Sequence, residues 1–83
     1  MSVHKQLTEH SKRQHERIVR FKQLDMMREL AIDEAIEQMK KTGICSVGKI
    51  NDITKQINEL ARQGIVPTRK LVSIEMVKEY VER

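Results

Sequence analysis

Large aromatic side chains are scarce in this sequence. Its 83 residues include one Tyr, one Phe and no Trp, so the bulkiest core-filling side chains are nearly absent. Five Met residues partly replace them, and Met fills gaps without fixing a unique packing. A chain this short also buries only about 60% of its unfolded surface. The core is therefore small, and such chains often gain stability from a partner subunit.

Cysteine occurs once, which excludes an internal disulfide and fits a reducing cytoplasm. Cys45 follows Ile44 with no base beside it, so we expect a buried structural thiol. No apolar run approaches the roughly 20 residues that span a bilayer, and the N-terminal stretch is polar. We therefore expect a cytoplasmic protein with no membrane partner.

Glycine and proline are absent from residues 2–42, and this absence predicts one long helix over about 3–41. Apolar residues recur along it near every 3.5 residues: Val3, Leu7, Ile18, Phe21, Leu24, Ala31 and Ala35, with Met27 and Met39 beside the stripe. His10 and Gln14 interrupt the stripe, so the helix is expected to fray or bend near residues 8–15. Met26 and Leu30 extend one flank, and Ile32 and Ile36 extend another. A helix that is apolar on more than one side is packed on more than one side.

Two shorter helices follow, at about 47–63 and 74–82. Gly43 ends the first helix, Ser46 is a candidate cap for the second, and Gly64 ends that helix. Because Pro67 disfavours a helical residue before it, residues 65–72 are read as an extended connector, with a helix resuming at Thr68 as the alternative. Ser73 is a good cap for the last helix.

These elements predict an all-α fold in a single domain, residues 1–83, with the two shorter helices folded against the second half of the long one. Residues 3–22 form a basic, lightly anchored arm, and residues 23–83 form the packed helical core. A helix of 40 residues is about 60 Å long. A compact chain of this size has a radius of gyration of roughly 12 Å. The helix must therefore break, protrude or be covered by a second subunit.

Charge is divided along the long helix. The chain has a net charge of +4, residues 1–22 carry +4, and residues 23–41 carry −2. Two antiparallel copies crossing near residue 23 would place the basic half of one helix along the acidic half of the other, which sets orientation. We expect such a homodimer, or a higher oligomer, to use these residues: Arg13 near Asp33, Arg17 near Glu29, and Phe21 and Leu24 between them.

Nucleic-acid binding is the alternative function. Its candidate residues are the basic ones of the long helix and the connector: Lys12, Arg13, Arg17, Arg20, Arg69 and Lys70. Acidic residues interrupt every basic stretch, and no aromatic platform for stacking bases is present. The connector is also longer than the three- or four-residue turn of a helix-turn-helix motif.

Metal-binding and catalytic patterns are not found. His4, His10 and His15 are six and five residues apart, whereas two helical metal ligands on one face lie three or four apart. The carboxylate row Asp25, Glu29, Asp33 and Glu37 has no His at the spacing of a di-metal bundle. We expect no metal, no cofactor, no small-molecule substrate and no enzymatic activity.

One resemblance covers the whole chain. It is carried by Met1-Ser-Val-His-Lys5, by Ile50-Asn-Asp-Ile-Thr54, by Gly64-Ile-Val-Pro-Thr-Arg-Lys70 and by Val72-Ser-Ile-Glu-Met-Val77. In these segments the chain resembles the YpbS-like family of short uncharacterised Bacillus proteins. The resemblance implies a small cytosolic bacterial protein, and it assigns no functional residue.

Overall fold

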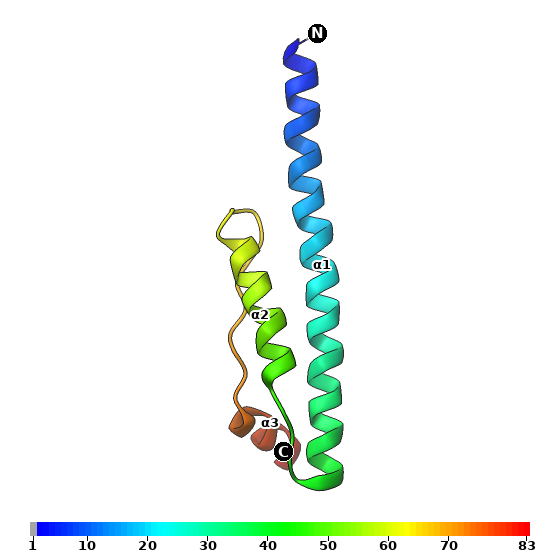
Figure 1. Cartoon of the computed structure of the whole chain (residues 1–83), viewed down its shortest axis with the longest axis vertical. Coiled ribbons are helices and arrows are strands. Elements are labelled where there is room, and N and C mark those ends of the chain that lie inside the picture. Colours follow the sequence, from blue (N-terminus) through cyan, green and yellow to red (C-terminus); the bar gives the residue numbers. More distant parts are fainter. Residues whose placement is uncertain (1) are drawn as a thin grey trace.

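The computed structural model describes the backbone of residues 2–83 and the side chains of residues 11–83. The predicted stripe residues Val3 and Leu7, and His4 and His10, lie outside the described side chains. Three helices follow one another: α1 (Ser2–Thr42), α2 (Gly48–Ala61) and α3 (Ile74–Glu82). α2 runs back beside the second half of α1, and α3 lies across the end of this pair near Thr42 (Figure 1). The predicted all-α fold is confirmed, and no strand occurs in residues 2–83.

α1 is a continuous rod, and most of its first half projects beyond the other two helices (Figure 1). The backbone stays helical through residues 8–15, so the fraying expected there does not occur. The molecule measures 61 × 20 × 17 Å, and its radius of gyration of 17.2 Å well exceeds the value of about 12 Å for a compact chain of this length. Of the three possibilities for this helix, the single chain adopts the protruding one.

α1 ends as its sequence predicts. Lys40 and Lys41 lie in its last turn, at the negative end of the helix dipole. Gly43 then adopts a left-handed φ of 76° and donates its N–H to the carbonyl of Met39 at 2.9 Å. The Thr42 hydroxyl also bonds the Gln38 carbonyl at 2.8 Å. Together these groups reverse the chain into α2.

The start of α2 differs from the prediction. Val47 occupies the N-cap position and its side chain makes no capping hydrogen bond. Ser46 lies one residue too early, and its hydroxyl accepts only a long 3.5 Å bond from the N–H of Gly48. Packing of the apolar stripe therefore holds the first turn of α2 in place. Ser73 does cap α3, as predicted, by accepting from the Met76 N–H at 3.2 Å.

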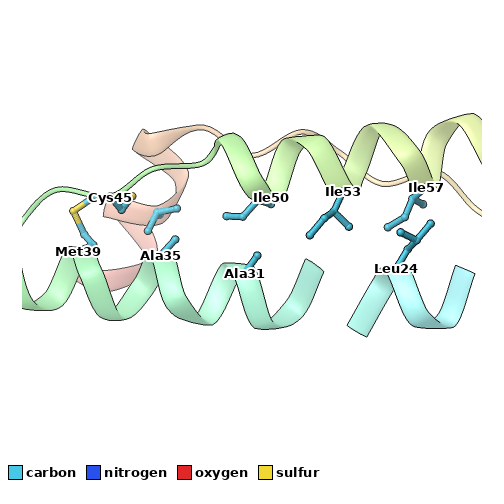
Figure 2. Close-up of a cluster of buried hydrophobic side chains, with 9 residues drawn as sticks. Leu24, Ala31, Ala35, Met39, Cys45, Ile50, Ile53 and Ile57 are labelled. Atoms are coloured by element: carbon cyan, nitrogen blue, oxygen red, sulfur yellow. The ribbon is translucent and has the colours of Figure 1, made fainter. Parts of the chain in front are cut away.

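A narrow core joins α1 to α2. From α1, Leu24, Ala31, Ala35 and Met39 point toward α2, which contributes Ile50, Ile53 and Ile57 (Figure 2). The two alanines allow the helix backbones to approach closely. Cys45 closes one end of the core, as expected for a structural thiol, and Val77 enters it from α3. Each fully buried isoleucine stabilises the fold by about 1.5–3 kcal/mol.

The connector is extended, as the main reading of residues 65–72 predicted, and two asparagines of α2 hold it. Asn51 bonds both the N–H and the carbonyl of Val72, at 2.7 and 2.9 Å. Asn58 bonds both backbone groups of Arg69 in the same way, at 2.8 and 3.0 Å. The seven-residue helical step from Asn51 to Asn58 and the three-residue extended step from Arg69 to Val72 both span about 10 Å. Both pairs of hydrogen bonds can therefore form with one straight extended segment.

Arg28 of α1 also holds the connector, through hydrogen bonds to the connector and to α2. Its Nη2 donates to the carbonyl of Lys70 at 2.9 Å, and its Nε donates to the hydroxyl of the fully buried Thr54, also at 2.9 Å. That hydroxyl donates in turn to the carbonyl of Ile50. The connector thus lies along α2 with every named polar group paired, which fixes the position of α3.

Candidate self-association surface

α1 has one side that faces its own chain and one side that does not. At about 100° per residue, Leu24, Ala31, Ala35 and Met39 share one side, and these are its buried residues. Ile32 and Ile36 lie next to that side and pack against α3 and Val72. The expectation that this half of α1 is packed on more than one side therefore holds for the Ile32 flank.

The opposite flank is uncovered. Met26 is 65% exposed and Leu30 is 59% exposed, although both are large and apolar. They belong to a straight row on the side of α1 away from α2, which we call the outer face: Lys12, Val19, Met26, Leu30, Asp33 and Glu37. Helix geometry places all six within about 60° of rotation. The outer face is basic at one end, apolar in the middle and acidic at the other end.

A shallow hollow of about 410 Å³ lies in the acidic end of the outer face. Leu30, Asp33, Glu34, Glu37 and Gln38 line it. Leu30 supplies an apolar side chain to its lining, and Asp33, Glu34 and Glu37 supply carboxylates. Such a hollow suits a side chain that is apolar along its stem and positively charged at its tip.

A second hollow, of about 360 Å³, lies between α1 and α3. Ile32, Ile36, Val72, Met76 and Tyr80 are among its lining residues. Arg28 and Asp33 supply its charged groups, and Arg28 is already bonded to Thr54 and Lys70. No charge pattern on this groove indicates what would fill it.

Asp25 and Arg69 form a salt bridge between α1 and the connector. The Nε and Nη2 of Arg69 lie 3.0 and 3.3 Å from the two oxygens of Asp25, and its guanidinium lies 5.2 Å from the ring centroid of Phe21. The hydrogen bond to Asp25 raises the pKa of Arg69, with Glu29 adding to the effect. Arg69 is therefore held within the chain as a cation with both a carboxylate and an aromatic partner.

Two of the predicted self-association residues are engaged within the chain. Leu24 is only 2% exposed and packs near Ile57 in the core, so it is not on the surface. Phe21 is half-buried beneath Arg69. The apolar stripe that contains both residues packs against α2 and the connector. From the sequence alone, such a stripe cannot be distinguished from a surface that binds a partner.

The predicted charge pairs also lie on different sides of α1. Arg13 and Asp33 are twenty residues apart and so are rotated by about 200°; Arg17 and Glu29 are rotated by about 120°. Arg17 is half-buried on the α2 side, whereas Asp33 is exposed on the outer face. A twofold dimer uses the same face of both copies. Arg13–Asp33 and Arg17–Glu29 therefore cannot both be contacts of one such dimer.

The predicted nucleic-acid residues do not form one patch. Lys12 lies on the outer face, while Arg13, Arg17 and Arg20 follow the α2 side, where Arg20 shares a hollow with Glu59. Arg69 is paired with Asp25, so it is not available to a phosphate. The side chain of Lys70 is exposed, and only its backbone carbonyl is bonded.

Neither a metal-ligand cluster nor a membrane span occurs among the described residues. Within the part of the chain that the structure describes, no group of three His, Cys, Asp or Glu residues could hold a metal ion. Among the described residues, no helix combines the length and apolar character needed to cross a membrane. The acidic row is divided instead: Asp25 faces the connector, and Asp33 and Glu37 face outward.

Comparison with known proteins gives two matches. The family model described as "Protein of unknown function (DUF2533)" matches residues 1–83. The chain is similar to "Uncharacterized protein YpbS" of Bacillus subtilis (strain 168), with 53% identity over 81 residues, covering 98% of this chain and 95% of the relative. No solved structure matches.

Proposed function

Because the chain belongs to the family of proteins of unknown function DUF2533, its fold must suggest its role, and we propose a non-enzymatic, self-associating protein-interaction module. The observation that carries this proposal is the long uncovered surface of α1. The rod has 41 residues, and 22 of them precede Leu24, the first core residue among the described side chains. Met26 and Leu30 stay exposed although they follow Leu24.

The energetics of a small chain support the proposal. The buried core consists of nine apolar residues, four of them from α1. A protruding helix with exposed Val19, Met26 and Leu30 leaves apolar surface in water, at about 25 cal/mol for each Å² that could be buried. A second copy covering this surface would lower the free energy of the folded state.

Nucleic-acid binding is the weaker alternative. It rests on Arg13, Arg17 and Arg20, which recur at three- and four-residue spacing on one side of α1. Arg69 no longer contributes, and no exposed aromatic residue accompanies the three arginines within residues 11–20. The self-association proposal needs no residue that is already engaged within the chain.

The solution mass tests the proposal. Sedimentation equilibrium at about 50 µM chain should give at least twice the 9.8 kDa mass of one chain, and the mass should fall on dilution because association depends on concentration. A mass of 9.8 kDa at every concentration up to about 200 µM would end the proposal. Light scattering after size exclusion is the appropriate check, because a rod of this shape elutes early even as a monomer.

A further inference from the structure

The outer face has the charge pattern of a surface that binds a second copy of itself in the opposite direction. Lys12 lies at one end, Asp33 and Glu37 lie at the other, and Val19, Met26 and Leu30 lie between them. Two parallel copies would place Lys12 beside Lys12 and Glu37 beside Glu37. Two antiparallel copies would instead place each basic end beside an acidic end.

In one antiparallel register, the charged and the apolar residues of the outer face are both paired with suitable partners. When residue 12 of one copy lies opposite residue 37 of the other, residue 19 lies opposite residue 30. Lys12 then meets Glu37, and Val19 meets Leu30, at both symmetry-related ends. Met26 lies opposite residue 23 of the second copy, so the two Met26 residues are offset by three residues, or about 5 Å along the helix axis. A shift by one heptad in either direction would remove both the Lys12–Glu37 and the Val19–Leu30 contacts.

We propose that the outer face of α1 binds the same face of a second copy, antiparallel and in this register. The inference rests on the proposed function and specifies which surface carries it. α2 packs on the buried side of α1, which points away from the outer face. α3 borders the outer face at Asp33, which also lines the hollow between α1 and α3. The hollow lined by Leu30, Asp33 and Glu37 receives Val19 and the long stem of Lys12 from the second copy.

The edges of this interface are also compatible with the register. In a twofold antiparallel pair, each flank of one helix lies beside the same flank of the other helix. Lys22 and Glu29 share a flank, so Lys22 approaches Glu29 of the second copy. Glu16 approaches Glu34 of the second copy, which is a like-charged contact. Lys49 lies 3.4 Å from Glu34 within the same chain and partly neutralises it.

Charge reversal tests the register against the proposed function. Lys12→Glu creates two like-charged contacts in the dimer and should raise its dissociation constant about tenfold. Adding Glu37→Lys reverses both ends and should restore the dissociation constant to within about threefold of the wild type. Arg13→Glu makes the same change in net charge on the adjacent residue, but on another side of the helix, and should have less than about a threefold effect.

Sedimentation equilibrium of these four proteins separates the possible outcomes, with circular dichroism confirming equal helix content. A monomeric wild type would end the proposed function and the interface together. A dimer that Lys12→Glu and Arg13→Glu weaken equally, or that the double variant does not restore, would overturn this interface and leave self-association standing. Rescue by Glu37→Lys, with Arg13→Glu near the wild type, would support both.

Discussion

Ile57→Ala should lower the free energy of unfolding by about 2–5 kcal/mol. Ile57 is 0% exposed, lies at the centre of the α2 stripe and packs against Leu24 of α1 (Figure 2). Its truncation removes apolar contacts and leaves a cavity between two helices that the rest of this small core cannot fill. Urea unfolding followed by circular dichroism, at one fixed chain concentration, measures the change.

Ile44→Ala is the matched control. It deletes the same atoms from a side chain that is 75% exposed, so its cost should stay within about 0.5 kcal/mol. Equal losses for the two variants would mean that the α1–α2 core does not stabilise the fold as its burial indicates. The comparison also shows whether the helix pair, rather than the protruding half of α1, supplies the stability.

Leu30→Glu should weaken self-association by about 100-fold or more, because it places a charge against Val19 of the second copy at both ends of the interface. Leu30 lies outside the core, so the unfolding free energy of the monomer should change by less than about 0.5 kcal/mol. Sedimentation equilibrium measures the first effect, and urea unfolding at low concentration measures the second.

Leu71→Glu makes the same substitution at a similarly exposed leucine of the connector, away from the outer face. Its effect on the dissociation constant should be less than about threefold. If Leu71→Glu disrupts the dimer while Leu30→Glu leaves it intact, the contact surface involves the connector side of the molecule. The pair of variants thus separates loss at a specific surface from a general effect of added charge.

Periodicity predicted the helices well because each has a clear apolar stripe and a clear boundary. Gly43 and Ser73 take the roles that the sequence assigned to them, at the end of α1 and the start of α3. Ser46 does not, because the helix begins one residue later than a serine cap would require. Ile65 adopts a φ of 73°, which costs a β-branched residue roughly 1–2 kcal/mol and has no local sequence signal.

The hydrogen bonds that hold the connector were not predictable from the pattern. Asn51 and Asn58 read as ordinary polar positions of a helix, since their partners, Val72 and Arg69, are 21 and 11 residues away. Their seven-residue spacing is the only local indication that they share a side. For the same reason Arg69 read as a free cation, whereas the structure pairs it with Asp25, 44 residues earlier.

The division of α1 into a basic half and an acidic half was readable from the sequence, but the side of the helix on which each charge lies was not. The sequence indicated an antiparallel match between basic and acidic halves, yet charge counts along a chain ignore rotation about the helix. Arg13 lies on the α2 side, whereas Lys12, one residue earlier, lies on the outer face. Only the buried residues of α1 show which side of the helix its own chain leaves uncovered.

A distance measurement between two copies tests the antiparallel dimer most directly. Ser11 is exposed and lies beside the proposed contacts without contributing to them, so it can be replaced by a spin-labelled cysteine on a Cys45→Ala background. In the proposed register the two Ser11 positions are separated by 27 helical residues, and double electron–electron resonance should report a distance of about 40 Å. A distance below about 20 Å, which parallel helices would give, or no dipolar coupling between copies at all, would contradict it.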